Sequence, residues 1–244
     1  RIDTNYRIGR NAEIFAEGGV DYIGAFSFLA TGAYEDFNAT GPFSYGMVGL
    51  RHNEWGQIRG FWNRFTLSGQ SVGGRPVDTR MIWNTYDVEA RLDRGFETGP
   101  IAHNLTLGAG YRRKTVEWDL FLENYHEDHF QVFFQDALRF GQAVQIVGGF
   151  RMDQHPLLDK PVWSPRAALV LRPSDTMAIR VSYSTAFRTF SFIESYTATV
   201  QPTPISAVGA RGLGTALEAE FTGARGVSPE KIRAVELGYA YVLE

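Results

Sequence analysis

The sequence lacks several features that would assign it to common classes of protein. Its 244 residues include no cysteine, which excludes disulfide scaffolds, Cys-ligated zinc and cysteine nucleophiles. No apolar run approaches the roughly 18 residues that a spanning helix needs, which argues against an α-helical membrane protein. The 24 Lys and Arg residues are balanced by 27 Asp and Glu residues, and this balance argues against a nucleic-acid partner.

The beginning of the sequence also lacks a recognisable signal. It reads Arg1-Ile-Asp-Thr4, without an initiating Met, a basic region or an apolar region of the kind that targeting peptides carry. We therefore expect a processed or incomplete chain.

Glycine and aromatic residues are abundant. The sequence contains 26 glycines, and 14% of its residues are aromatic, whereas only 21% are charged. Disordered chains are poor in aromatic residues, and helical proteins are poorer in glycine. This composition favours a large antiparallel β protein.

Polarity alternates with a period of two along much of the chain. In residues 13–22 the even positions are apolar or glycine, and the odd positions include Glu13, Glu17 and Asp21. Segments 82–93, 144–153 and 178–188 alternate in the same way. Because successive side chains of a strand point to opposite faces, each segment is predicted to be a strand with one apolar and one polar face.

The predicted strands are long, and their connections alternate between short and long. Most have about 9–12 residues, which is close to what a tilted strand needs to cross a bilayer. Eleven segments are predicted: 1–8, 13–22, 43–51, 57–67, 82–93, 101–112, 129–140, 144–153, 164–172, 178–188 and 231–242. Transmembrane barrels have tight periplasmic turns and long outer loops. The sequence therefore predicts an all-β fold, an antiparallel transmembrane β-barrel segment, with a soluble sandwich or propeller as the alternative.

The number of predicted strands suggests part of a larger barrel. Single-chain bacterial barrels have an even number of strands, and unpaired edges are not tolerated in lipid. We therefore expect residues 1–244 to be an interior stretch of a barrel domain, truncated at both ends. The alternation is weakest in segments 43–51 and 57–67, where it places Arg51 and Arg64 on the outward face.

Three stretches resemble a known family. They are Val147-Gly-Gly-Phe-Arg-Met-Asp153 followed by Ser164-Pro-Arg-Ala-Ala-Leu169, then Ile179-Arg-Val-Ser-Tyr-Ser-Thr-Ala-Phe-Arg-Thr-Phe190, and Val227-Ser-Pro-Glu-Lys-Ile-Arg-Ala-Val-Glu-Leu-Gly-Tyr239. In order and spacing they resemble the TonB-dependent outer-membrane receptors, which have a strand ending in Phe-Arg-x-Pro and a later Pro-Glu-x…Glu-x-Gly motif. Phe190 stands where the family usually has proline. The resemblance covers residues 129–242 well and the first half only by pattern.

The resemblance implies a 22-stranded barrel closed by an N-terminal plug, of which this chain would supply about eleven strands and no plug. Family members bind a scarce nutrient, usually a ferric siderophore or cobalamin, and TonB then displaces the plug. The implied partners are the TonB complex, through the absent plug segment, a ferric siderophore or similar small ligand, and outer-membrane lipid. The implied location is the bacterial outer membrane, and the implied activity is transport, not enzymatic catalysis and without a cofactor.

Six residues are predicted to contact the ligand. Four lie on the predicted inward face near the outer end of their strands: Arg151, Asp153, Arg166 and Arg188. Arginine suits an anionic ferric chelate because its charge is permanent and its donors are fixed. Phe190 and Tyr196 in the following outer loop are candidates for stacking on a ligand. The alternative roles are contact with the plug, a hydrated lumen wall, or packing within the loops.

One stretch of the sequence contains residue types that can bind a metal or haem. The stretch His126-Glu-Asp-His129 offers two imidazoles and two carboxylates, with Asp153 and His155 at a neighbouring loop. Because consecutive strand residues point in opposite directions, His126 and His129 need not converge, and no metal site is expected. Haem receptors of this family carry a histidine in the region that corresponds to residues 189–230, and this chain has none there.

Two other classes of function stay open on the sequence alone. One is a passive, porin-like outer-membrane channel, which would have no plug. The other is an outer-membrane or soluble β enzyme acting on glycans or lipids, which would need a compact Ser, His and carboxylate set. The five histidines are scattered along the chain, and the order of the three family-like motifs favours the receptor.

Overall fold

The fold is built almost entirely from antiparallel β-strands. The computed structural model describes residues 1–28, 37–71, 78–119, 121–196, 198–206, 216–224 and 228–242. Eleven strands form one large sheet: β1 (Ile2–Ile8), β2 (Ala12–Phe28), β3 (Phe37–His52), β4 (Gly56–Ser71), β5 (Asp78–Thr98), β6 (Ile101–Trp118), β7 (Tyr125–Phe140), β8 (Val144–Gln154), β9 (Val162–Ser174), β10 (Met177–Arg188) and β13 (Glu230–Tyr241). Two further strands, β11 (Ala198–Ser206) and β12 (Ala216–Thr222), pair with each other, and α1 (Phe192–Tyr196) is the one helix among these residues.

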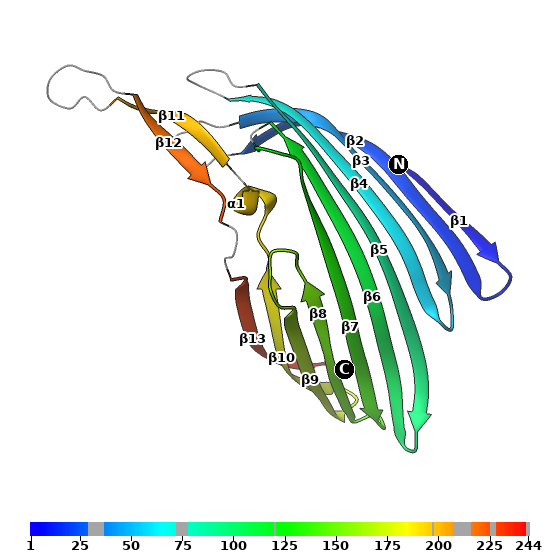
Figure 1. Ribbon diagram of the computed structural model, residues 1–244. Helices are drawn as coiled ribbons and strands as arrows, with labels where there is room; N and C mark the ends of the chain where they lie inside the picture. The colour runs from blue at the N-terminus through cyan, green and yellow to red at the C-terminus, as the bar shows by residue number, and fades with distance from the viewer. Residues whose placement is uncertain are drawn as a thin grey trace.

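The large sheet is a meander in which each strand pairs with the next strand of the sheet. Its order runs from β1 through β10 and then to β13, and all of the pairs are antiparallel. The sheet curves strongly, and β1 and β13 form its two open edges (Figure 1). All eleven predicted strands are present, so the predicted fold class is confirmed. Among the described residues, no helix has the length and apolar character needed to span a bilayer.

The short connections form tight turns at one end of the sheet, as predicted. They follow β1, β3, β5, β7 and β9. Gly9, Gly99 and Gly141 lie in three of these turns with φ angles of 65°, 60° and 57°. Glycine adopts this left-handed conformation without the steric cost that a Cβ atom brings. Glycine at these positions therefore allows the narrow reversals.

The long connections are shorter than predicted, because the strands continue into them. The predicted loops 23–42 and 113–128 are partly strand, since β2 reaches Phe28 and β6 reaches Trp118. The longest strand, β5, has 21 residues, about twice what a bilayer crossing requires. The backbone hydrogen bonds continue beyond the point where apolar and polar side chains cease to alternate. Periodicity therefore underestimates the lengths of the strands, and β5 extends beyond its predicted segment at both ends.

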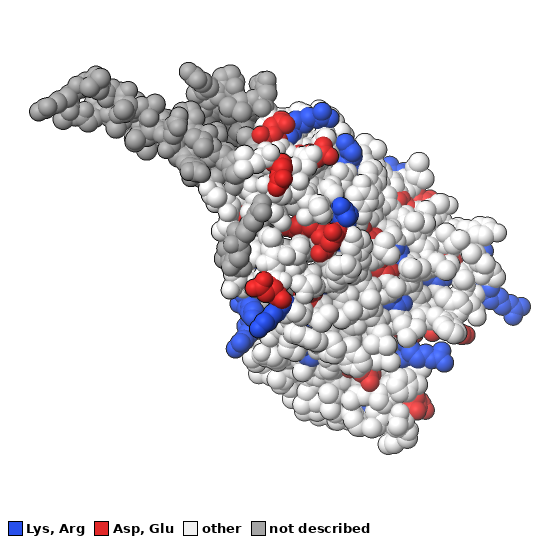
Figure 2. All heavy atoms as spheres, viewed as in Figure 1, with Lys and Arg blue, Asp and Glu red and all other residues white. Residues whose placement is uncertain are grey.

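The two faces of the sheet differ in polarity. Register places Asp87 beside Arg112 and Glu89 beside Arg59, on one face. The opposite face exposes large apolar side chains on strand after strand: Val20, Val48, Ile58, Val88, Val132, Ile146, Val181 and Leu237. Figure 2 shows small groups of charge separated by wide uncharged areas. An exposed apolar face of this extent is typical of a surface that lipid covers.

The structure corrects the predicted face of Arg51. This side chain lies on the polar face, where its Nη1 atom is 3.8 Å from Glu13 Oε2 and its guanidinium lies over the ring of Phe15. Arg64 of β4 is paired in register with Ser44 of β3. Ser44 and Arg51 are an odd number of residues apart on β3 and therefore point to opposite faces, so Arg64 lies on the outward face, as predicted. Glycine and aromatic residues on both faces of β3 obscured its alternation.

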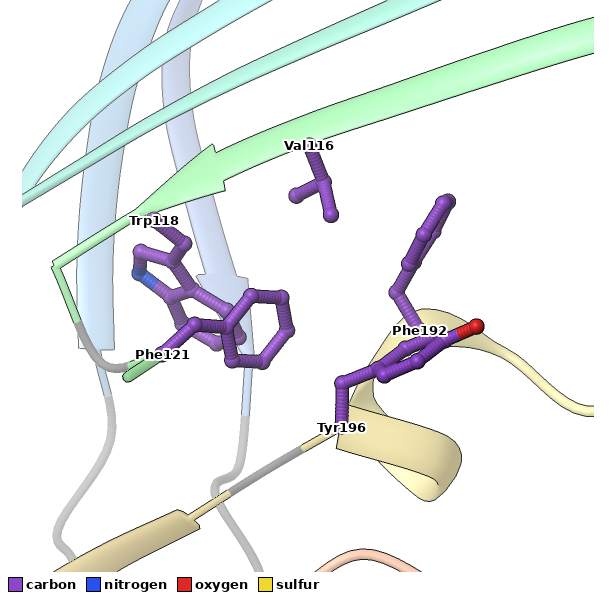
Figure 3. Packing of buried hydrophobic residues seen from close by; sticks show 5 residues of the cluster. All are labelled: Val116, Trp118, Phe121, Phe192 and Tyr196. Atoms are coloured by element: carbon purple, nitrogen blue, oxygen red, sulfur yellow. The ribbon is translucent and has the colours of Figure 1, made fainter. Parts of the chain in front are cut away.

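A small aromatic core lies on the polar face, near the end that carries the long connections. Phe192 and Tyr196 of α1 pack against Val116, Trp118 and Phe121 (Figure 3). The connection 189–230, predicted to be a loop, therefore contains α1, β11 and β12. No sequence pattern predicts α1, because a five-residue helix is too short to display a helical period and depends on packing for its stability.

Candidate ligand-binding cavity

A cavity of about 760 Å³ lies on the polar face toward the end with the long connections. Strands β5 to β10 contribute to its wall. Five of its lining side chains are Lys or Arg and two are Asp or Glu: Arg91, Arg112, Lys114, Arg151 and Arg166, with Glu89 and Asp153. The cavity therefore carries an excess of positive charge, which favours an anionic ligand.

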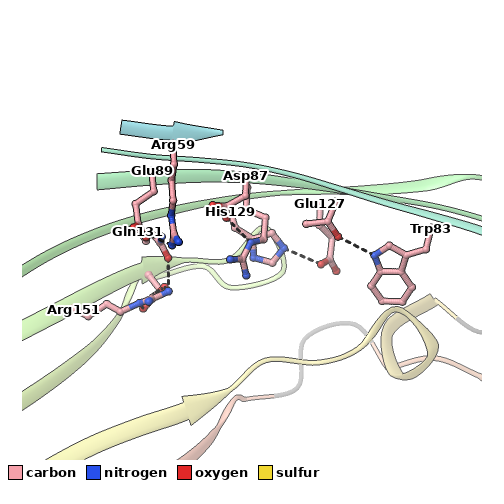
Figure 4. Close-up of polar contacts among 11 residues, drawn as sticks. Arg59, Trp83, Asp87, Glu89, Glu127, His129, Gln131 and Arg151 are labelled. Carbon is pink, nitrogen blue, oxygen red and sulfur yellow. Dashed lines mark hydrogen bonds and ion pairs between the residues drawn. The ribbon is translucent and has the colours of Figure 1, made fainter. Parts of the chain in front are cut away.

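Ion pairs along the polar face offset charges of both signs in the wall of the cavity (Figure 4). Arg112 Nε donates a hydrogen bond to Asp87 Oδ2 over 2.7 Å, and Arg59 Nη2 lies 3.1 Å from Glu89 Oε1. Each pair joins adjacent strands. The pairs hold the wall of the cavity in place and leave part of its basic charge unbalanced.

Three of the six predicted ligand contacts line this one cavity: Arg151, Asp153 and Arg166. Arg151 Nε donates to both Asp153 carboxylate oxygens over 2.9 and 2.8 Å, and Arg151 Nη2 donates to Gln131 Oε1. Arg166 is exposed and forms no hydrogen bond or ion pair with any residue that the structure describes. Arg166 therefore has more of its charge available to a ligand than Arg151 has.

The other three predicted contacts lie outside the cavity. Arg188 is held between two carboxylates, with Nη1 3.1 Å from Glu194 Oε2 and Nη2 2.9 Å from Glu230 Oε1. Phe190 lies edge-on to His155, and Tyr196 is buried against Tyr125, with ring centroids 4.2 Å apart. Their contact with a ligand stays a prediction.

The basic residues Arg91, Arg112 and Lys114 were not among the predicted contacts. Arg112 and Lys114 alternate on one face of β6, and register places Arg112 opposite Asp87. The alternation alone could have placed them on the inward face. Only the pairing of strands shows that they share a cavity with Arg151 and Arg166.

A second polar cluster borders the cavity and combines Glu127, His129 and His155. Glu127 and His129 are two residues apart on β7 and share its inner face, and His155 follows β8. His126 is exposed on the other face of β7, so the two histidines of His126-Glu-Asp-His129 do not converge. Burial lowers the pKa of His155 to about 4, which keeps its imidazole neutral at neutral pH.

The sheet defines a class of protein. Long antiparallel strands with one exposed apolar face, one charged face, tight turns at one end and long connections at the other are the features of a transmembrane β-barrel. The chain belongs to the TonB-dependent receptors, because residues 2–242 match the family model described as "TonB dependent receptor-like, beta-barrel". Proteins of this family are transporters of the bacterial outer membrane and not enzymes.

Solved structures of similar fold include three siderophore receptors. The siderophore receptor PirA from Pseudomonas aeruginosa is 14% identical, with a TM-score of 0.60, and the match covers 98% of this chain and 48% of that chain. The ferric enterobactin receptor PfeA of Pseudomonas aeruginosa is 12% identical, with a TM-score of 0.69, and the match covers 98% of this chain and 40% of that chain. BauA, the ferric preacinetobactin receptor from Acinetobacter baumannii, is 14% identical, with a TM-score of 0.54, and the match covers 99% of this chain and 44% of that chain.

The chain thus spans less than half the length of each of these receptors. At these identities the likeness shows the fold alone. No curated protein sequence gives a significant match.

Proposed function

We propose that the complete protein is an outer-membrane receptor that imports an anionic ferric siderophore with energy supplied through TonB. The observation that carries this proposal is the basic cavity on the polar face of the sheet, with five Lys or Arg and two Asp or Glu among its lining residues. Guanidinium groups form strong, charge-assisted hydrogen bonds with the oxygen atoms of anionic chelates. The named ligands of similar structures, ferric enterobactin and ferric preacinetobactin, support the same class of substrate.

In this proposal Arg166 contributes an unpaired charge to the ligand, and Arg151 contributes donors held in position by Asp153 and Gln131. Arg188, Phe190 and Tyr196 contact the ligand or position the outer connection that surrounds it. Cobalamin, the other nutrient that the family resemblance implies, is less suited to a wall with this excess of basic charge.

We also propose that residues 1–244 form an interior part of the barrel domain of a longer receptor. The coverage of 40–48% of the solved receptor chains supports this division. The plug, and the segment that contacts the TonB complex, would then lie in other parts of the complete protein.

The test is the uptake of radioactive iron by a strain in which the complete gene has been deleted. Ferric catecholate, hydroxamate and citrate complexes are supplied one at a time under iron limitation. We expect the deletion strain to lose uptake of one anionic complex, and the complete gene to restore it only where TonB is present.

Uptake that is restored equally well without TonB would overturn the proposal in favour of a passive, porin-like channel. Normal uptake of every iron complex by the deletion strain, together with loss of cobalamin uptake, would overturn the substrate class and leave the family assignment intact.

A further inference from the structure

Glu127, His129 and His155 direct three metal-binding groups toward one point. His129 Nε2 lies 3.0 Å from Glu127 Oε2, and His155 Nε2 lies 3.7 Å from the same oxygen. The two imidazole rings are 4.6 Å apart and nearly perpendicular. One ligand atom from each residue can be chosen so that all three lie within 4.8 Å of one another. Strand β7 supplies two of the groups, and the connection after β8 supplies the third.

The cluster is buried and incompletely hydrogen-bonded. Glu127 and His155 are each only 1% exposed. Glu127 Oε1 and His155 Nε2 have no hydrogen-bond partner, and among the described residues no Lys or Arg nitrogen lies within 4.0 Å of Glu127, although Lys114 faces it across β6 and β7. A buried carboxylate without a full set of partners is costly, so these atoms call for a partner that the protein itself does not supply.

The chemistry of the three groups identifies that partner as a cation. Imidazole nitrogen and carboxylate oxygen are the ligands of Zn²⁺ in sites with three protein ligands, where a fourth position stays open for water. In a tetrahedral site with bonds of about 2.0–2.1 Å, ligand atoms are about 3.4 Å apart. The separations of His129 Nε2 and His155 Nε2 from Glu127 Oε2, 3.0 and 3.7 Å, lie on either side of this value. All three ligand atoms lie within 4.8 Å of one another, and they must reach a separation of about 3.4 Å for a tetrahedral site to form.

We propose that Glu127, His129 and His155 form a binding site for a divalent transition-metal cation of the Zn²⁺ class. The bound cation cross-links the connection after β8 to β7 beside the basic cavity. All three ligands come from this chain, and His129 and His155 also line the basic cavity.

Binding requires a change at His155. The backbone N–H of Leu157 donates to His155 Nδ1 over 3.1 Å, so in the neutral ring the proton resides on Nε2. Ligation through Nε2 requires that proton to move to Nδ1, and Leu157 N–H then loses its acceptor. His129 Nε2 lies 3.0 Å from Glu127 Oε2 and donates its proton to that carboxylate, so ligation through His129 Nε2 moves this proton to Nδ1 as well. The cation therefore replaces two hydrogen bonds, one from the Leu157 N–H to His155 and one from His129 to Glu127.

The test uses the complete receptor, purified in detergent and stripped with a chelator. Titration with Zn²⁺ alone should show that the native receptor binds one equivalent. Glu127→Gln and His155→Gln should each abolish this binding or lower the Zn²⁺ affinity by more than about 100-fold. Even residues that only support a ligand change metal affinity by about 10–100-fold. His126→Gln is the matched control, because His126 is on the same strand, exposed, and on the opposite face. We expect it to retain the full equivalent.

A measurement on the unmodified receptor removes the dependence on variant folding. Zinc-edge X-ray absorption of the one-equivalent complex should show two imidazoles and light-atom ligands at about 2.0–2.1 Å. Hydrogen exchange at the Leu157 amide should become faster when Zn²⁺ binds. Absence of micromolar Zn²⁺ binding, an absorption spectrum without imidazole, or equal binding by folded His155→Gln receptor would each overturn the proposal.

Discussion

Arg188 and Glu194 form a two-point ion pair that ties the last residue of β10 to α1. Arg188 Nη1 and Nη2 lie 3.1 and 3.0 Å from the two carboxylate oxygens of Glu194. The backbone N–H and hydroxyl of Ser191 donate to the same carboxylate. This pair therefore fixes the start of the long connection 189–229 and directs Phe192 toward the aromatic core.

The Arg188–Glu194 pair predicts that α1 loosens in acid. Hydrogen bonds from Arg188 and then from Ser191 lower the pKa of Glu194 from its ordinary value of 4.5 to about 2. The contribution of the carboxylate is therefore complete above pH 4.5 and is lost as the pH falls toward 2. Hydrogen exchange in the peptide that contains α1, corrected for the intrinsic rate, should be constant from neutral pH to about pH 5 and rise below about pH 4.

Glu194→Gln should give at neutral pH the faster hydrogen exchange of α1 that the native protein shows in acid, because the amide keeps the size of the side chain and removes its charge. Glu123→Gln is the control, since Glu123 is an exposed carboxylate in a neighbouring connection. Equal protection of α1 in native protein and Glu194→Gln would show that packing alone holds the helix.

Phe192 is predicted to anchor α1 through burial. It is 2% exposed, and its ring lies edge-on to Trp83 with centroids 5.1 Å apart. Phe192→Ala should weaken the docking of α1 by about 3–5 kcal/mol, the usual cost of removing a buried phenylalanine. The expected result is faster hydrogen exchange in residues 189–196 with no change in the exchange of β5. Leu122→Ala, at an exposed side chain, should leave both regions unchanged.

Arg166 is predicted to matter more for binding an anionic ligand than other arginines of its strand. Arg166→Gln should weaken binding of the ferric siderophore identified by uptake by about 10–100-fold, which corresponds to one hydrogen bond between charged groups. Arg172→Gln is the matched control, since Arg172 is on the same face of β9 and outside the cavity lining. Fluorescence titration of the complete receptor measures both affinities. Equal affinities for the two variants would exclude a direct role of Arg166.

Two glycines of β4 are predicted to differ sharply in their tolerance of alanine. Gly56 has a φ angle of 114°, and a Cβ atom there would lie 2.0 Å from the carbonyl oxygen of Arg91. Gly60 has nothing within 4 Å of the same position. Gly56→Ala should therefore destabilise the barrel by about 1–3 kcal/mol or more, and Gly60→Ala by much less.

The measurement for this pair is urea unfolding of the complete receptor. Folded and unfolded barrels are distinguished by electrophoresis, because the migration of the folded form changes on heating. A lower urea midpoint for Gly56→Ala alone is expected. Similar midpoints for the two variants would mean that the turn before β4 adjusts to accept a side chain.

The sequence by itself determined the eleven strands and most of their faces. A strand has a period of two, and the contrast between lipid and lumen makes that period visible in residues such as Glu13, Glu17 and Asp21. The tight turns could be predicted for a similar local reason, because glycine at Gly9 and Gly141 fits a left-handed backbone.

Only the tertiary structure decided which side chains meet. Register brings Arg112 to Asp87, and the curvature of the sheet brings Arg166 and Arg112 to one cavity. His155, in the connection after β8, lies beside Glu127 of β7, whereas His126, the neighbour of Glu127 in sequence, points to the opposite face. Strand alternation fixes a face, but proximity across a sheet depends on register and on the path of each connection, which are set by contacts between residues distant in the chain.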